Sequence, residues 1–144
     1  MNKYEDKLCG FAIIYGVGVD MSENTDIRLH EGELNVMELL WSNKELAAKD
    51  IANIIKEYIG WEKNTTYTVI KRLIDKGAIE RTEPGFICRA IVTKQKIQQI
   101  EIKCLLDKLF SGSFRNMLNE YLKSGSLSSS EKEEAIKLLS KYNG

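Results

Sequence analysis

The chain has 144 residues, 43% of them hydrophobic, and its 21 basic and 21 acidic side chains cancel at pH 7. This length suits one domain, or a small domain with a helical extension, and this hydrophobic content excludes a disordered chain. A net charge of zero excludes a uniformly basic surface, so the distribution of charge carries more information. Residues 63–94 hold seven basic and three acidic side chains, a local net charge of +4, whereas residues 1–27 carry −3.

The beginning of the chain contains an apolar run from Cys9 to Val19, which is too short to span a bilayer. We interpret residues 1–27 as an N-terminal extension outside the fold, of which residues 1–20 would precede an alternative start at Met21. The remaining cysteines, Cys88 and Cys104, lie far from Cys9 and from the single His30. Such spacing indicates neither a disulfide framework nor a zinc site. We therefore predict a reduced, cytoplasmic protein with no metal, no other cofactor and no membrane insertion.

Apolar residues at helical spacing predict a first helix over Gly32–Trp41 and a second over Ala47–Ile59, with a turn at residues 42–46. The two tryptophans, Trp41 and Trp61, are interpreted as packing residues. The apolar face of the second helix is expected to consist of Ile51, Ile54, Ile55, Tyr58 and Ile59.

The stretch KNTTYTVIKRLIDKG, residues 63–77, predicts a third helix. Thr66 and four aliphatic residues share one arc of the helical wheel, and the opposite arc holds short polar residues, two cations and one acid, Asp75. Tyr67 falls at the boundary between them. Gly77 is expected to end this helix as its C′ residue, and Asn64 is a candidate N-cap. Threonine and asparagine are weak helix formers, so their presence on the exposed arc favours a role other than helix stability.

A β-hairpin is predicted next, from two alternating segments, residues 78–82 and 86–92, around a turn at Glu83-Pro84-Gly85. Three helices followed by a hairpin are typical of a winged helix, a variant of the helix-turn-helix. The predicted fold class is mainly α with a small β-hairpin wing (α+β). It comprises an N-terminal winged helix-turn-helix domain, residues 28–94, and a C-terminal helical dimerisation domain, residues 95–144.

After Thr93 the pattern is helical again, with interruptions at residues 111–113 and 123–130. Ser130 and Glu133 match a capping box that would begin the last helix. Three amphipathic helices in about fifty residues make a thin core, which a second copy of the chain would complete. The residues expected at this dimer interface are Ile97, Ile100, Leu105, Leu109, Phe110, Phe114, Leu118, Leu122, Leu138 and Leu139.

In a helix-turn-helix the second helix of the pair enters the major groove of double-stranded DNA. That helix is the third in this chain, so its exposed arc and the hairpin arginines are the expected DNA contacts. Asn64 and Thr68 are suited to base edges, Lys71 and Arg72 to phosphates, and Arg81 and Arg89 to the wing. The complete predicted set is Lys63, Asn64, Thr65, Tyr67, Thr68, Lys71, Arg72, Arg81 and Arg89. No catalytic residues are predicted, because no nucleophile, phosphate-loop or metalloprotease motif is present.

From Glu33 onward the chain resembles the penicillinase and methicillin-resistance repressor family. The resemblance is carried by ELNVMELLW, AKDIANII, WEKNTTYTVIKRLIDKGAI and LLDKLFSGSF. It implies a homodimeric, cytoplasmic transcriptional repressor on a palindromic operator, which controls β-lactam resistance genes. In induced members, a membrane sensor of β-lactams triggers cleavage in the first C-terminal helix. The family's Asn-Phe cleavage position aligns here with Cys104-Leu105.

Two alternatives remain open at this point. A winged helix can serve as a protein-interaction module that does not depend on operator binding, and this reading gains if Lys71, Arg72, Arg81 and Arg89 do not share a face. A redox-sensing regulator would act through Cys88 or Cys104.

Overall fold

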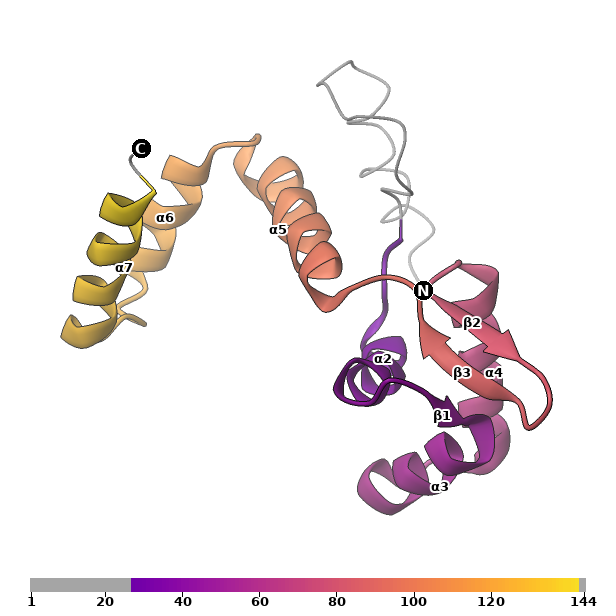
Figure 1. Ribbon diagram of the computed structural model, residues 1–144. Helices are drawn as coiled ribbons and strands as arrows, with labels where there is room; N and C mark the ends of the chain where they lie inside the picture. The colour runs from indigo at the N-terminus through magenta and orange to yellow at the C-terminus, as the bar shows by residue number, and fades with distance from the viewer. Residues whose placement is uncertain (1–26, 143–144) are drawn as a thin grey trace. The chain divides into compact units, whose positions relative to one another are not determined.

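The computed structural model describes residues 27–142, which form two compact units divided between Ile102 and Lys103. The first unit contains three helices, α2 (Glu31–Ser42), α3 (Ala48–Ile59) and α4 (Lys63–Asp75). It also contains three strands, β1 (Leu46–Ala47), β2 (Ile79–Thr82) and β3 (Ile87–Ala90), in the antiparallel order β1-β3-β2 (Figure 1). This arrangement confirms the predicted winged helix: mainly α, with β2 and β3 as the wing.

The remaining helices are α5 (Lys94–Phe110), α6 (Phe114–Lys123) and α7 (Ser129–Lys141). The first part of α5 belongs to the winged-helix unit, which ends at Ile102, and the rest of α5 belongs to the C-terminal unit with α6 and α7. The predicted domain division at residues 94/95 falls at the start of α5, whereas the two compact units divide within this helix, between Ile102 and Lys103. The predicted extension, residues 1–27, lies outside the described residues except for Ile27, whose side chain is buried.

The core of the winged-helix unit lies between α2, α3, α4 and the sheet. Its most deeply buried side chains come from every one of these elements: Val36, Met37, Leu40, Ile51, Ile55, Ile70, Leu73, Ile79 and Cys88. In α3 the buried face ends at Ile55. Tyr58 and Ile59, which we assigned to that face, are 81% and 43% exposed because they belong to the last turn, beyond the core.

Two local predictions, one about the turn before α3 and one about the start of α4, need correction. The turn at residues 42–46 contains the start of β1, in which Leu46 pairs with Cys88 and Ala47 with Ile87. A two-residue strand is too short to produce a detectable alternation. The N-cap of α4 is Glu62 and not Asn64, so Asn64 lies inside the first turn.

The end of α4 follows the sequence closely. Gly77 has a φ of 72°, the left-handed conformation that glycine adopts without a steric penalty. Its N–H donates to the carbonyl of Ile74, and the N–H of Ala78 donates to the carbonyl of Leu73, both at 2.9 Å. This pair of bonds is a Schellman motif, and it confirms Gly77 as the C′ residue.

The two tryptophans are packing residues of the winged-helix unit. The Trp41 indole N–H donates to the carbonyl of Val92 at 2.9 Å, which joins α2 to the end of the wing. The Trp61 ring lies over the first turn of α2, where a Cβ atom on Gly32 would come within 3.1 Å of it. Because the chain has only these two tryptophans, tryptophan fluorescence excited selectively reports on this unit alone.

Helix α7 begins two residues earlier than the predicted capping box implies. Ser128 is the N-cap, its hydroxyl accepts from the Glu131 N–H at 3.2 Å, and Glu131 Oε2 accepts from the Ser128 N–H at 2.8 Å. These bonds from Ser128, the backbone one first, hold the pKa of Glu131 below its usual value. The sequence SSSEKEE contains two overlapping Ser-x-x-Glu matches, and spacing alone does not distinguish them.

Thr66 is completely buried in α4, and its hydroxyl has no hydrogen-bond partner in the structure. We expect Thr66→Val to stabilise the winged-helix unit by about 1 kcal/mol, because valine has a similar shape and removes an unsatisfied polar group. Urea unfolding followed by tryptophan fluorescence measures this change. Thr65→Val, one position away on the exposed surface, is the control and should stay within about 0.5 kcal/mol of the wild type. Equal effects of the two substitutions would contradict the prediction.

Candidate nucleic-acid interface

One face of α4 is polar, and its side chains are exposed. The buried side of the helix consists of Thr66, Val69, Ile70 and Leu73, as the wheel predicts. The opposite side, called here the exposed face of α4, carries Asn64, Thr65, Thr68, Lys71, Arg72 and Asp75, and Lys63 is exposed in the first turn beside this face. The structure therefore brings five of the nine predicted DNA contacts onto one helix surface, together with the carboxylate of Asp75.

The cations on this face, and Lys63 beside it, are available to a ligand. Within residues 27–142, no ion pair or hydrogen bond engages the side chains of Lys63, Lys71 or Arg72. Most other cations of the winged-helix unit are paired, for example Lys56 with Glu62 at 3.3 Å and Lys94 with Glu38 at 2.8 Å. A free guanidinium and two free ammonium groups on one helix suit a polyanion such as the phosphate backbone of DNA.

Thr68 has a defined orientation on this face. Its hydroxyl donates to the carbonyl of Asn64 at 2.9 Å, one turn earlier in the helix. The donor of the hydroxyl is thus occupied, but its acceptor capacity and the methyl group remain available. An adenine or cytosine amino group could donate to such a hydroxyl, and a thymine methyl could contact such a methyl.

The two arginines of the wing lie on opposite faces of the hairpin. The register pairs Arg81 with Cys88 and Glu80 with Arg89, and directly opposed residues in a sheet project to the same side. Arg81 therefore shares the side of buried Cys88, whereas Arg89 lies on the other side with Glu80. Both are ion-paired, Arg81 with Glu83 at 3.0 Å and Arg89 with Glu80. We predicted that both arginines would share a surface with the exposed face of α4, and the structure does not place them together.

Tyr67 connects the exposed face of α4 to the wing. The residue is 37% exposed, and its ring meets the ring of Phe86 edge-on, with centroids 6.3 Å apart. The guanidinium carbon of Arg81 lies 3.8 Å from the centroid of the same Phe86 ring. Phe86 was not among the predicted site residues, because an aromatic residue after a turn is not by itself a signal for nucleic-acid binding.

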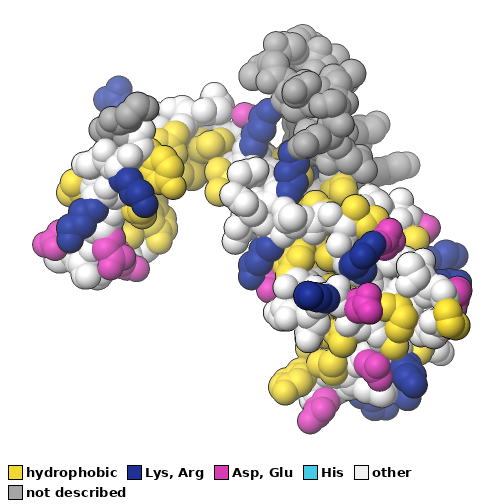
Figure 2. Space-filling model, viewed as in Figure 1, with side chains coloured by type: hydrophobic (Ala, Val, Ile, Leu, Met, Phe, Trp, Pro, Cys, Tyr) yellow, Lys and Arg dark blue, Asp and Glu magenta, His cyan; other side chains and the backbone are white. Residues whose placement is uncertain are grey.

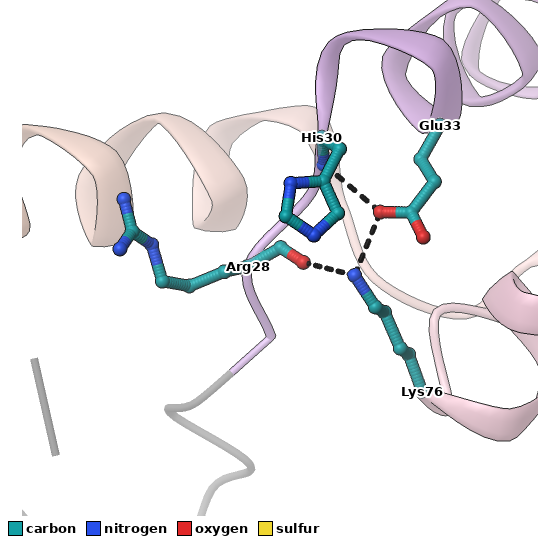
Figure 3. Close-up of polar contacts among 4 residues, drawn as sticks. All are labelled: Arg28, His30, Glu33 and Lys76. Carbon is teal, nitrogen blue, oxygen red and sulfur yellow. Dashed lines mark hydrogen bonds and ion pairs between the residues drawn. The ribbon is translucent and has the colours of Figure 1, made fainter. Parts of the chain in front are cut away.

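A buried ion pair fixes the end of α4 against the start of α2 (Figure 3). Glu33 is only 3% exposed, and its Oε2 atom accepts from Lys76 Nζ at 2.7 Å and from the His30 N–H at 2.9 Å. Lys76 Nζ also donates to the carbonyl of Arg28 at 2.8 Å. The two charged residues are 43 positions apart in the chain, so no local pattern indicates their contact. Through this pair the start of α2 and the segment before it set the position of α4.

The predicted dimerisation residues divide into two groups. Ile97 and Ile100 are 3% and 9% exposed in the winged-helix unit, which leaves little of either side chain for a partner chain. The others lie in the C-terminal unit, where neither α6 nor α7 has a buried residue. Phe110 and Leu118 are half-buried. The more exposed ones are Leu105, Leu109, Phe114, Leu122, Leu138 and Leu139.

Figure 2 shows hydrophobic side chains gathered along the C-terminal helices. The exposed fractions there are large, for example 64% for Leu109 and 58% for Leu138. A single folded chain rarely leaves so many large apolar side chains in water, and such surfaces mark sites of protein association.

The two cysteines in the described part of the chain, Cys88 and Cys104, are not joined in a disulfide bond with each other. Burial raises the pKa of the Cys88 thiol, and the nearby positive charge of Arg81 opposes this only in part. A protonated, buried thiol reacts slowly with oxidants, so Cys88 does not favour the redox-sensing alternative. Between Ile27 and Tyr142 there is no cluster of three or more side chains able to hold a metal ion. None of the helices over this range combines the length and apolarity needed to cross a bilayer.

Several known proteins are similar to this chain in sequence. The penicillinase repressor family model matches residues 29–141. The methicillin resistance regulatory protein MecI of Staphylococcus aureus (strain N315) is 27% identical over 121 residues, 83% of this chain and 98% of MecI. The penicillinase repressor of Bacillus licheniformis is 21% identical over 117 residues, 80% of this chain and 91% of that protein. The solution structure of the DNA-binding domain of the repressor BlaI aligns with a TM-score of 0.45 at 22% identity, covering 48% of this chain and 87% of that domain.

Proposed function

The chain belongs to the penicillinase repressor family, and from this membership we infer that it is a DNA-binding transcriptional repressor. The observation that carries the proposal is the exposed face of α4, the second helix of a helix-turn-helix, where the unpaired Lys71 and Arg72 lie beside short polar side chains and the unpaired Lys63 is exposed in the first turn. Asn64, Thr65 and Thr68 would read base edges in the major groove. Lys63, Lys71 and Arg72 would bind phosphates, and bound repressor would block polymerase.

We propose further that the repressor acts as a homodimer on a palindromic operator. The support is the exposed apolar surface of α6 and α7, together with Leu105 and Leu109 of α5. A two-fold dimer would place two copies of α4 on two half-sites of the operator, so that each copy raises the local concentration of the other. A dimer bound to DNA would work in the cytoplasm of a bacterial cell.

The regulated genes are proposed from the relatives. MecI is named as a methicillin resistance regulatory protein, and two other relatives are named as penicillinase repressors. We therefore propose β-lactam resistance genes as targets and a membrane sensor protease as an indirect partner. The Cys104–Leu105 bond lies inside α5. A protease binds an extended chain, so cleavage there would require α5 to unfold locally first.

A mobility-shift titration over a series of salt concentrations tests operator binding. We expect strong discrimination between operator and random duplex, and an affinity that falls steeply as salt rises. A monomeric protein that binds no duplex even at low salt would refute the proposal.

Thr68 and Arg72 are expected to contribute differently. Thr68→Ala should cost about 1 kcal/mol or more at one base pair and relax specificity there, because the hydroxyl and methyl are lost from a base-reading position. Arg72→Ala should weaken binding to all duplexes alike, because it removes a phosphate contact. Affinities for operators substituted at single base pairs distinguish the two effects. An equal loss on every duplex for Thr68→Ala would exclude its base-reading role.

The interaction-module alternative gains one observation, namely the opposite orientation of Arg81 and Arg89. That observation concerns only the wing. Family membership and the free cations of α4 support DNA as the partner.

A further inference from the structure

The tip of the wing contains a contact cluster that links the hairpin to α4. Phe86 meets Tyr67 of α4 with its ring at an interplanar angle of 80°, and the Arg81 guanidinium lies against the same ring. Tyr67 borders the exposed face of α4, and β2 packs on α4 (Figure 1). The ring of Phe86 thus sets how far the guanidinium of Arg81 stands from α4.

This spacing suits a DNA duplex. The two ring contacts together keep the guanidinium of Arg81 within about 10 Å of the Tyr67 ring, whereas the major groove of B-DNA is about 12 Å wide. A helix seated in the groove has phosphates along both edges at comparable distances. Arg81 is therefore placed to meet the DNA backbone at one edge of a groove that α4 occupies. The other arginine of the wing, Arg89, lies on the opposite side of the hairpin and is not.

The side chain of Phe86 is not what the turn itself requires. Phe86 has a φ of 57°, a left-handed conformation that is strained for a bulky residue and easy for glycine or asparagine. The structural bonds of the residue are made by its main chain, since its carbonyl accepts from the Ala48 N–H at 3.0 Å and its N–H donates to Glu83 Oε2 at 3.3 Å. An aromatic ring kept at a strained position points to a role for the ring.

Glu83 occupies the position of an anion at this cluster. One of its carboxylate oxygens lies 3.0 Å from the Arg81 guanidinium, and both side chains are substantially exposed. Exposed ion pairs of this kind are weak, so a phosphate oxygen can replace the carboxylate. The ring of Phe86 would hold the guanidinium in place during such an exchange, because cation–π attraction does not depend on the anion.

We propose that Phe86 is a positioning residue for DNA binding, which holds Arg81 at the border of the α4 face so that a backbone phosphate takes the place of Glu83. The inference rests on the proposed function and assigns the wing a sequence-independent phosphate contact. Glu83 then weakens binding to every duplex by competing for the same guanidinium.

Fluorescence anisotropy with a random-sequence DNA duplex, over a salt series, tests the proposal on the full chain. Arg81→Met should lower the affinity about 3- to 10-fold and reduce the salt slope by about 1 per protomer. Phe86→Asn, which keeps the left-handed turn but removes the ring, should reproduce both effects. Combining it with Arg81→Met should add nothing further. Phe86→Tyr should retain wild-type binding, and Glu83→Gln should raise the affinity about 3-fold at low salt.

The controls separate positioning from folding. Tryptophan fluorescence checks that each variant is folded, and Ile91→Asn, an exposed apolar residue just after the wing, should leave the salt slope unchanged. If Phe86→Asn does not fold, Phe86→Leu replaces it, because leucine keeps the bulk without a π face. A wild-type slope in the ringless variant, or full additivity with Arg81→Met, overturns the inference while the proposed function stands. A wild-type chain that binds no duplex overturns both.

Discussion

Replacing Lys76 by methionine is expected to lower the free energy of unfolding of the winged-helix unit by about 3 kcal/mol. The substitution leaves the Glu33 carboxylate almost fully buried with only the His30 N–H as a partner, and it also removes the donor to the Arg28 carbonyl. A loss of this size is a large share of the stability of a small domain, which is about 5–10 kcal/mol. Urea unfolding followed by tryptophan fluorescence measures it.

Two further variants serve as a control and as a partial rescue of this loss of stability. Lys71→Met removes an exposed, unpaired lysine from the same helix and should change stability by less than about 0.5 kcal/mol. Glu33→Gln in the Lys76→Met background removes the buried charge and should recover at least half of the loss. If Lys76→Met is no more harmful than Lys71→Met, then the Glu33–Lys76 pair does not stabilise the unit.

Placing glutamate at both Leu138 and Leu139 is expected to convert the proposed dimer to monomers and to weaken binding to the proposed operator by about 100-fold or more. Both leucines are more than half exposed in the single chain, so their replacement should cost it little stability. At a dimer interface, however, two buried carboxylates without partners would be strongly unfavourable. Analytical ultracentrifugation gives the oligomeric state, and the mobility shift gives the affinity.

Ser140→Glu is the matched control, because it adds a negative charge to the same helix at a polar, exposed position. It should leave both the dimer and operator binding unchanged. A double leucine variant that remains dimeric would show that α7 does not form the interface. Leu109 and Phe114 would then be the next positions to test.

The parts of the fold that depend on neighbouring residues were predictable. The apolar and polar arcs of α4 follow from helical spacing, and the end of α4 follows from the left-handed conformation available to Gly77. Helix beginnings were less predictable. Asn64 and Glu62 both lie near the start of α4, and the backbone conformation, extended at Glu62, decides which of them is the N-cap. The strand β1 is too short to leave a pattern at all.

Contacts between distant parts of the chain were not predictable from one sequence. The Glu33–Lys76 pair and the Arg81–Phe86 contact each require the folded arrangement of several elements. Likewise, the same apolar stripe of α5 contains Ile97, which is buried, and Leu105, which is exposed. A helical wheel shows that a stripe must be covered but not which surface covers it.

The carbonyl of Arg28 has a practical consequence for trimming the protein. This oxygen accepts from Lys76, the Arg28 side chain lies 3.8 Å from Glu101 of α5, and the flanking side chains of Ile27 and Leu29 are buried. A shortened version that starts at α2 would therefore lose a segment that contacts both α5 and the end of α4. Any minimal fragment intended for crystallography or NMR should therefore start at or before Ile27 and not at the beginning of α2.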